Sequence, residues 1–389
     1  MEFATLTVVM LGALAGPLLV LPRRWHVPVV VGELLVGVLL GSTGLGYIDP
    51  ADGWLSFLAE IGFELVMFTA GSHVPVRDER VRRALGVGLA RAALVGLVAA
   101  VLGVLLARSF GTGHPQLYAV LMASSSAALV LPVVGQLKLG GGPVLQLITQ
   151  VAIADTACIV ALPVVIAPAG AGRAAVGAVA VLAAGAALIG VLYLLERSGV
   201  RRRVHRVSDE RKLALELRIS MLVLFALAAI ATRFGVSVML AGFVLGLGLA
   251  TLGPPRRLAR QLFAVTEGFF GPVFFVWLGA SLDLRALATR PALILLGVLL
   301  GLGAVVSHAA ARPTGQPLSL GVLGSAQLGV PVAAATLGVQ LRVLAPGEPA
   351  ALLLGALVTV ALSTLAAGRA VRQGLTSEPP PATAPAPDP

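Results

Sequence analysis

The segment PVLQLITQVAIADTACIVALPVVIA (143–167) is an apolar run with a single acid, Asp155, near its middle. A run of this length is long enough to cross a bilayer as a helix. A carboxylate at bilayer depth costs at least ~2.5 kcal/mol, so Asp155 is a candidate functional residue. The two lysines of the chain, Lys138 and Lys212, fall between apolar runs. An acid without an obvious fixed counter-charge is suited to carrying a proton or a metal cation. The alternative is a structural acid bonded to neighbouring hydroxyl groups.

The composition places this chain among all-α integral membrane proteins. Of its 389 residues, 58% are hydrophobic and 12% are charged, whereas a soluble protein has about 25% charged residues. A net charge of +10 is typical of nucleic-acid binders, but the basic residues here lie mostly between apolar runs. This is the positive-inside pattern, so we expect the lipid bilayer and no nucleic acid as a partner. The single cysteine, Cys158, excludes an intramolecular disulfide.

Charges, prolines and glycine clusters divide the chain into thirteen candidate membrane-spanning helices. We expect these helices at 4–22, 27–42, 54–72, 84–108, 116–137, 143–167, 172–195, 213–233, 235–252, 258–281, 291–311, 317–341 and 349–372. The first is interpreted as a retained helix, because the start of the chain has neither a basic region nor a small-residue cleavage pattern.

The positive charges predict the orientation in the membrane. The loops after helices 1, 3, 5, 7, 9 and 11, together with the tail, hold twenty lysines and arginines, against six on the opposite side. We therefore expect the N-terminus outside and the C-terminus in the cytoplasm of a plasma membrane. Residues 1–375 are expected to form the membrane domain, and the Pro-rich tail 376–389 is expected to be disordered.

Two groups of six helices, about 1–167 and 213–373, flank a connector helix at 172–195 and have opposite orientations. This arrangement predicts two inverted repeats, with interrupted crossover helices near an ion site. Corresponding helices carry mid-helix interruptions, Ser124, Ser125, Ser126 and Pro132 in the first half and Ser325, Gln327, Gly329 and Pro331 in the second. Unwound backbone at these points exposes carbonyl groups to a cation. The simpler interpretation is that Pro and Gly are common in membrane helices.

Because Asp155 directly follows one interrupted helix, we predict an ion and proton site made of Asp155, Thr156, Ser124, Ser125 and Ser126. Further polar candidates are Thr149, Gln150, Ser325, Gln327, His308 and Glu33. The side chains of Thr149 and Gln150 are expected to line the same cavity, or to bond back to backbone carbonyls.

The other ionisable residues have simpler interpretations. His308 is expected to be a helix-end histidine near the cytoplasmic interface, although it lies one turn beyond a position of interest for transport. Glu33 can carry an ion or stabilise the start of its helix through the helix dipole. Glu60 and Glu64 share a helix face, and we expect a structural ion pair with Arg91 or Arg218.

Several segments together resemble one transporter family. They are VPVVVGELLVGVLLGSTGLG (27–46), LAEIGFELVMFTAG (58–71), ASSSAALVL (123–131), IADTACIV (153–160) and FFGPVFFVWLGASLDL (269–284). In combination they resemble the sodium/proton exchanger domain of the monovalent cation:proton antiporter-2 family, the group that contains Kef-type proteins. The resemblance implies a homodimeric antiporter without cofactors. It also implies elevator-like alternation between a core and a dimerisation domain.

The chain departs from the pattern of that family at several positions. Ala154 stands where many relatives have a second Asp or an Asn, and Gly303 aligns with a Lys or Arg. Gln327 and Gly329 replace an Arg and an acid of relatives. Kef-type proteins carry a nucleotide-binding C-terminal domain that does not follow here, so ligand gating of that kind is not expected.

These observations predict a secondary active antiporter that exchanges Na⁺ or K⁺ for H⁺ and is not an enzyme. Asp155 alone binds the transported cation and the proton in turn, which predicts electroneutral exchange. One alternative is a sodium-coupled carrier of an organic anion, which needs a basic group in the core. Another is a non-transporting membrane sensor or partner subunit. Ser124 to Ser126 have no His and acid partner nearby in sequence, which argues against a hydrolase.

Overall fold

The computed structural model describes residues 3–20, 29–72, 79–166, 171–198, 214–234, 236–252, 256–282 and 284–376. The predicted disordered tail lies outside the described residues, except for Thr376. Most of the predicted cytoplasmic loop between Arg197 and Lys212 also lies outside them.

The described chain is helical apart from one isolated bridge between Leu139 and Thr376. The first part forms α1 (Phe3–Val20), α2 (Val29–Leu40), α3 (Gly53–Ser72), α4 (Glu79–Phe110), α5 (Pro115–Ala123), α6 (Ala127–Gln136), α7 (Gly142–Ile166) and α8 (Ala171–Arg197). The second part forms α10 (Leu215–Arg233), α11 (Val238–Leu252), α12 (Arg256–Val265), α13 (Gly271–Ala280), α14 (Leu284–Ala288), α15 (Pro291–Ala309), α16 (Leu318–Gly324), α17 (Gly329–Gln340) and α18 (Glu348–Arg372). A π-helical turn (Thr266–Phe270) joins α12 to α13, and a 3₁₀ turn (Arg312–Thr314) precedes α16.

Among the described residues, nine helical segments are long and apolar enough to cross a membrane, and shorter apolar helices accompany them. This supports a multi-pass membrane protein, while the exact number of thirteen spans stays a prediction. Two of the expected helices, 116–137 and 317–341, are each broken into two short helices. The expected helix at 258–281 forms as α12 and α13, which are joined by the π-helical turn.

Several helix starts follow from local chemistry. Pro occupies the first helical turn of α5, α15 and α18, where its missing N–H removes no hydrogen bond. Before α3, the Asp52 carboxylate accepts hydrogen bonds from the N–H groups of Trp54 and Leu55, at 2.9 and 3.0 Å. The Leu55 N–H in particular lowers the pKa of this carboxyl. Asp52 therefore stabilises the first turn of α3.

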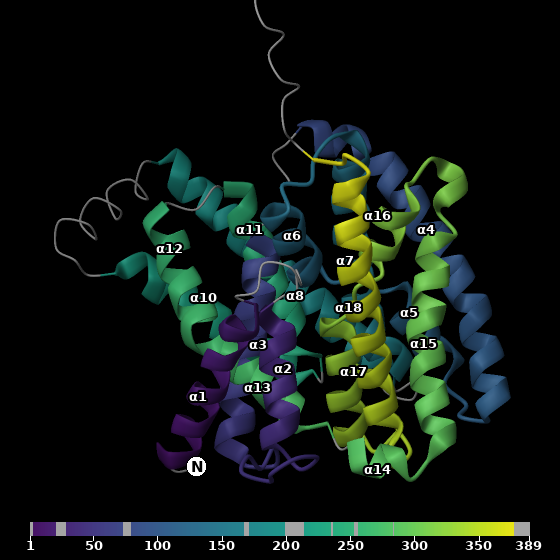
Figure 1. Ribbon diagram of the computed structural model, residues 1–389. Coiled ribbons are helices and arrows are strands. Elements are labelled where there is room, and N and C mark those ends of the chain that lie inside the picture. Colours follow the sequence, from purple (N-terminus) through teal and green to yellow (C-terminus); the bar gives the residue numbers. More distant parts are fainter. Residues whose placement is uncertain are drawn as a thin grey trace, which may run out of the picture.

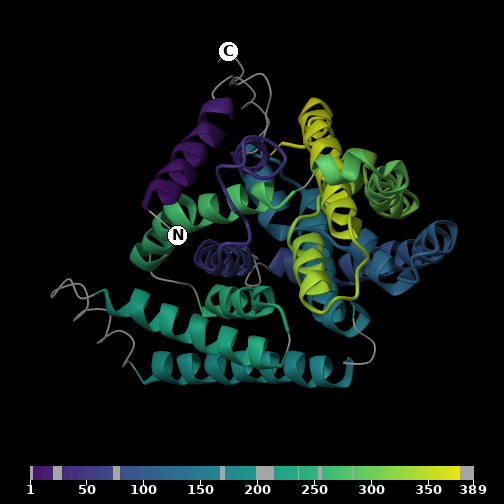
Figure 2. The same ribbon diagram turned by 90° about the horizontal axis from the view of Figure 1, so that it is seen from below.

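The helices form two groups. The first, called here the crossing bundle, comprises α4 to α7 and α15 to α18; the second, the flanking layer, comprises α1 to α3, α8 and α10 to α13. Within the bundle, α4 packs on α5 and α7, and α15 packs on α18; within the layer, α3 packs on α11 and α2 on α13. Figure 1 shows α1 and α10 on one side of the molecule and α4 and α15 on the other. Figure 2 shows the same division from below, with α8, α10 and α11 in successive rows.

Glycines allow the flanking helices to approach each other closely. A Cβ atom at Gly37 would lie 2.2 Å from the Val276 carbonyl oxygen, and one at Gly279 would lie 2.1 Å from that of Leu34. Both contacts are with backbone atoms, which cannot rotate away. The crossing of α2 and α13 therefore depends on small residues, as is usual for helix pairs in membranes.

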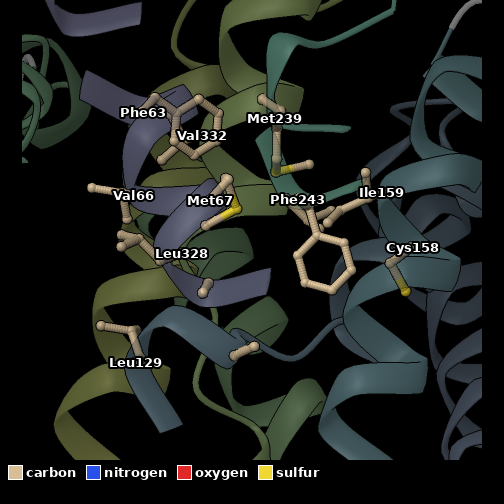
Figure 3. Packing of buried hydrophobic residues seen from close by; sticks show 14 of the residues in the cluster. Phe63, Val66, Met67, Leu129, Cys158, Ile159, Met239, Phe243, Leu328 and Val332 are labelled. Carbon is tan, nitrogen blue, oxygen red and sulfur yellow. The ribbon is translucent and has the colours of Figure 1, made fainter. Parts of the chain in front are cut away.

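Where the two groups meet, the packing is apolar and includes two methionines. Figure 3 shows Met67 of α3 and Met239 of α11 close to Leu328 and Val332 of the crossing bundle. A Cβ atom at Gly329 would lie 3.0 Å from the Met239 sulfur and 3.4 Å from that of Met67. Flexible thioethers adapt to changing neighbours, so this boundary is suited to relative movement.

The crossing of α2 and α13 gives a first testable prediction. We expect Gly37→Ala and Gly279→Ala to lower the free energy of unfolding by about 1–3 kcal/mol, because the helices must separate to admit the methyl group. Thermal unfolding of the detergent-solubilised protein measures the loss. Gly96→Ala in α4 is the control, since a Cβ there meets nothing within 4 Å. Equal effects at the three positions would contradict the prediction.

Candidate ion-binding site

The first helix break lies at Ser124, Ser125 and Ser126, between α5 and α6. All three side chains are buried. The Ser124 backbone is extended (φ −69°, ψ 151°), and its hydroxyl donates to the Leu121 carbonyl oxygen at 2.8 Å. Serine ends a helix in this way because its side chain competes for backbone hydrogen bonds. Pro132, which we expected to take part in the interruption, instead lies inside α6.

The second break lies at residues 325–328, between α16 and α17. The Ser325 hydroxyl donates to the Val322 carbonyl oxygen at 2.7 Å, three residues back, as the Ser124 hydroxyl does in the first break. Pro331 lies in the first turn of α17, where it does not break the helix. The two breaks are therefore built alike, and serine rather than proline ends the first short helix of each pair.

The two breaks cross and satisfy each other's backbone groups. The Gln327 side-chain amide donates to the carbonyl oxygens of Leu121 (2.6 Å) and Ser124 (3.5 Å) at the end of α5. In return, the Ser125 hydroxyl lies 2.7 Å from the Gly324 carbonyl oxygen at the end of α16. In Figure 1, α5 and α17 lie in the lower part of the view, and α6 and α16 lie in the upper part. Carbonyls at the ends of buried helices need such donors, because no water replaces them.

Asp155 lies beside the first break. Its side chain is 1% exposed, and its Oδ2 accepts a hydrogen bond of 2.9 Å from the Ala127 N–H, the first residue of α6. The N-terminus of a helix carries a partial positive charge that stabilises an anion. No described basic residue forms an ion pair with Asp155. The buried carboxylate is thus held by a backbone dipole, without a fixed positive charge among the described residues.

The three serines of the break have different surroundings. Ser126 has a buried hydroxyl oxygen with no partner among the described residues, and it directly precedes Ala127. The Ser125 hydroxyl is within hydrogen-bonding distance of Gly324 and of His308, and the Ser124 hydroxyl donates to Leu121. Ser126 is therefore the serine of the break whose hydroxyl has no hydrogen bond among the described residues.

Three of the predicted polar residues make other contacts. The Thr156 hydroxyl donates to the Ala152 carbonyl and the Thr149 hydroxyl to that of Leu145, each at 2.8 Å within α7. Gln150 accepts a hydrogen bond of 2.8 Å from Gln316. Thr149 thus makes the back-bonded contact of the second interpretation, and a cavity shared by Thr149, Gln150 and Asp155 stays a prediction.

His308 contradicts the expectation of a histidine at the cytoplasmic interface. Its side chain is 0% exposed, because α16 folds back over the end of α15. A Cβ atom at Gly321 of α16 would lie 3.0 Å from the His308 carbonyl oxygen. The ring Nε2 lies 3.1 Å from the Ser125 hydroxyl, and Nδ1 lies 2.9 Å from the Ala304 carbonyl oxygen. His308 thus contacts the first break from the side of α15.

The hydrogen bonds around His308 depend on the protonation state of its ring. A carbonyl only accepts, so the contact with Ala304 requires a proton on Nδ1. The Ser125 hydroxyl has one proton, which goes either to Nε2 or to the Gly324 carbonyl. Only a ring protonated on both nitrogens supplies all three hydrogen bonds, whereas a neutral ring leaves one contact without a proton. The hydrogen bonding of Ser125 is therefore coupled to the protonation of His308.

Three of the acids considered in the sequence, Glu33, Glu60 and Glu64, lie in the flanking layer. Glu33 is buried in α2 against Gly16 of α1, where a Cβ atom would lie 2.6 Å from its Cγ. Glu64 is 2% exposed, and its Oε1 has no partner among the described residues. The Arg91 guanidinium instead donates to the Thr314 hydroxyl and carbonyl, and Arg218 is exposed. The predicted ion pair of Glu60 or Glu64 with Arg91 or Arg218 is therefore wrong, because these charges belong to helices that do not bring them together.

Two participants of the break left no recognisable signal in the sequence. The Ala127 N–H and the Gly324 carbonyl are backbone groups, and their role depends on where each helix stops. Gly303, which aligns with a basic residue of relatives, packs against α5, and a Cβ atom there would lie 2.4 Å from the Met122 sulfur. The ring that reaches the break comes from His308, five residues further along α15.

The family model described as "Sodium/hydrogen exchanger, transmembrane" matches residues 9–373. The chain belongs to the sodium/hydrogen exchanger family. This assignment agrees with the resemblance of the five segments and places the chain among transporters rather than enzymes. In such proteins the transported ions are substrates, and no cofactor is used.

Two relatives of this chain are named as Na⁺/H⁺ antiporters. YjbQ of Bacillus subtilis (strain 168), named as a candidate Na⁺/H⁺ antiporter, is 26% identical over 376 residues, which cover 91% of this chain. The match covers 61% of the length of YjbQ, so this chain spans less than two thirds of that relative. A candidate Na⁺/H⁺ antiporter of Methanocaldococcus jannaschii, number 3, is 25% identical over 276 residues, which cover 68% of each chain.

Solved structures share the fold of the exchanger. The structure of the sodium proton antiporter MjNhaP1 from Methanocaldococcus jannaschii at pH 8 has a TM-score of 0.66 at 15% identity, covering 96% of this chain and 98% of that chain. An electron-microscopy map of the same antiporter gives a TM-score of 0.70 at 16% identity, with equal coverage. At this level of identity the likeness establishes the fold alone.

The crossing contacts of the exchanger give a second prediction. We expect Gln327→Leu to lower the free energy of unfolding by about 1–3 kcal/mol, because the Leu121 carbonyl loses its buried donor. Denaturant titration in detergent, followed by tryptophan fluorescence, measures the change. Gln136→Leu is the control, since Gln136 is exposed at the end of α6. A loss that is no larger for Gln327→Leu than for the control would show that the cross-break bond adds no stability.

Proposed function

We propose that this exchanger is a secondary active antiporter that exchanges a monovalent cation, Na⁺ or K⁺, for H⁺. The proposal rests on the buried carboxylate of Asp155 in α7. This carboxylate accepts a hydrogen bond from the first residue of α6 and has no basic partner among the described residues. The names of YjbQ and of the Methanocaldococcus jannaschii relative support Na⁺ and H⁺ as the exchanged ions.

The coupling follows from the charge of a single site. With a proton or a cation bound, Asp155 and its ligand are neutral together and can cross the apolar barrier at a low cost. An empty carboxylate must move as a bare charge, and its desolvation makes that step unfavourable. Exchange therefore requires one ion to replace the other. The Ser126 hydroxyl, beside the Ala127 N–H, supplies a further oxygen for the cation.

One cation and one proton per cycle make the exchange electroneutral. Ala154 precedes Asp155, so the site has no second adjacent acid. His308 contacts Ser125 rather than Asp155, and we assign it a positioning role at the break. Neither Arg91, bonded to Thr314, nor the exposed Arg218 supplies the basic group that an organic-anion carrier needs.

The same proposal includes the architecture. We assign two inverted repeats, about 1–167 and 213–373, within thirteen spanning helices, with 172–195 as the connector. Matching neighbours support this, because α4 packs on α7 as α15 packs on α18, and α6 packs on α7 as α17 packs on α18. The crossing bundle moves against the flanking layer, and the flanking layer joins two copies into a homodimer. The charge bias places the N-terminus outside and the C-terminus in the cytoplasm of the plasma membrane.

A third prediction tests the carrier residue. In proteoliposomes with an imposed pH gradient, addition of Na⁺ or K⁺ should dissipate the gradient for the wild type. Asp155→Asn should reduce this flux to the level of protein-free liposomes, because the amide can release no proton. Its carboxamide oxygen still accepts from the Ala127 N–H, so the folded structure is retained.

Asp49→Asn is the matched control, because Asp49 is an exposed acid in the loop before α3. We expect it to keep the wild-type flux. Flux that survives Asp155→Asn would place the carrier elsewhere. An absence of flux with both cations in the wild type would favour the sensor or organic-solute function instead.

A fourth prediction tests the stoichiometry. A net movement of one charge against 100 mV changes the free energy by about 2.3 kcal/mol, so an electrogenic exchanger would respond strongly to an imposed potential. We expect the initial rate of cation-driven proton flux to be the same at 0 and at 100 mV of either sign. The potential is set by an ionophore for an ion that is not transported, and a rate that follows its sign would exclude electroneutral exchange.

A further inference from the structure

A cavity of about 330 Å³ lies between the flanking layer and the crossing bundle. Five helices contribute to its wall, with Phe63 from α3, Thr232 from α10, Val238 from α11, Trp277 from α13 and Thr336 from α17. Of the α3 residues in the lining, Ala59 and Glu60 belong to the first half of the helix, so the cavity lies on the side of the bilayer at which α1 begins. In the proposed orientation this is the outer side.

Among the described residues that line this cavity, Glu60 is the single ionisable one. It is half-buried, and among the described residues it has neither a hydrogen bond nor an ion pair. A carboxylate within a membrane helix is costly unless a partner or water compensates it. The cavity gives Glu60 access to water, and its charge remains available to a mobile cation.

Hydroxyl oxygens accompany this carboxylate. Thr232, Ser237 and Thr336 line the same cavity. The Thr232 hydroxyl donates within its own helix, to Ala228 and Ala229, and the Ser237 oxygen accepts the Met239 N–H. Each oxygen retains lone pairs for a cation, since a hydroxyl has two. One carboxylate with neutral oxygens matches the single charge of Na⁺ or K⁺.

The acidic face of α3 continues from the cavity toward the break. Glu64 lies one turn deeper than Glu60 on the same face and is buried, with an oxygen that lacks a partner among the described residues. Figure 3 shows Phe63 beside Val332, both in the cavity wall, with Met67 and Leu328 further along. α3 also packs on α6, whose first residue donates to Asp155.

We propose that the Glu60 cavity is a cation-access site, which holds the monovalent cation on the outer side before it reaches Asp155. The proposal rests on the antiport function proposed above. A fixed negative charge in a confined cavity raises the local concentration of cations. Glu60 therefore sets the apparent affinity for the cation from one side only, while the turnover is set by Asp155.

Oriented proteoliposomes test this assignment. Glu60→Gln should raise the apparent KM for Na⁺ or K⁺ added at the α1-start side by roughly five- to tenfold, with the maximal rate and the KM at the opposite side unchanged. Glu60→Asp should keep most of the affinity. Asp49→Asn, which removes an exposed charge on the same side outside the cavity, should leave both KM values unchanged.

The outcomes separate this site from the antiport function. Wild-type flux with an unchanged KM in Glu60→Gln, or an equal rise on both sides, would remove the access site and leave the antiporter. If Asp49→Asn raised the KM by the same factor, the effect would come from surface charge in general and not from the cavity. An absence of wild-type flux would remove both proposals.

A second measurement uses the wild-type Glu60 side chain, so it does not depend on the folding of a Glu60 variant. Labelling of Glu60 by a carbodiimide, quantified by mass spectrometry, should slow when Na⁺ or K⁺ is added to the wild type. The protection should persist in Asp155→Asn, because the cavity lies before the carrier site. Labelling at a constant rate with and without either cation would overturn the proposal.

Discussion

The crossing of two broken helices is the arrangement on which the rest of this exchanger depends. A helix that stops inside a bilayer leaves carbonyl and N–H groups that lipid cannot satisfy. Here Gln327 and Ser125 supply donors to the opposite short helix, at the carbonyls of Leu121 and Gly324. One N–H group at the start of α6, that of Ala127, is satisfied by Asp155. The same constraint that makes broken helices costly therefore creates both the anchor of the carboxylate and its electrostatic support.

This support by dipoles has a functional consequence. A lysine or arginine beside Asp155 would neutralise it permanently and compete with the transported cation. A helix N-terminus contributes only a partial charge, so the site keeps its need for a proton or a cation. His308 reaches the same break through Ser125, and a ring protonated on both nitrogens would direct the single Ser125 proton to Gly324. The proposed carrier, Asp155, and the histidine thus meet one short stretch of unwound backbone.

The boundary between the crossing bundle and the flanking layer combines two kinds of contact. Within the flanking layer, glycines bring the backbones of α2 and α13 into direct contact, which makes that pair rigid. At the boundary itself, the thioethers of Met67 and Met239 lie against Gly329 and adapt to movement. The Glu60 cavity lies between the same two groups, at the boundary where we propose that cations enter.

The sequence by itself determined the membrane class, the helical architecture and the family, and it singled out Asp155 as the candidate carrier residue, because these follow from the hydrophobic runs, the charge bias and local motifs. It also located the two interruptions, although it assigned a share of the first to Pro132, which lies inside α6. Only the tertiary structure decided which polar side chains meet. His308 is near the end of its helix in sequence, yet α16 covers it. Thr149 and Thr156 are near Asp155 along the chain, yet they bond to their own helix. The partners of a break are backbone groups and side chains from distant helices, and their proximity depends on the packing of the whole bundle rather than on local sequence.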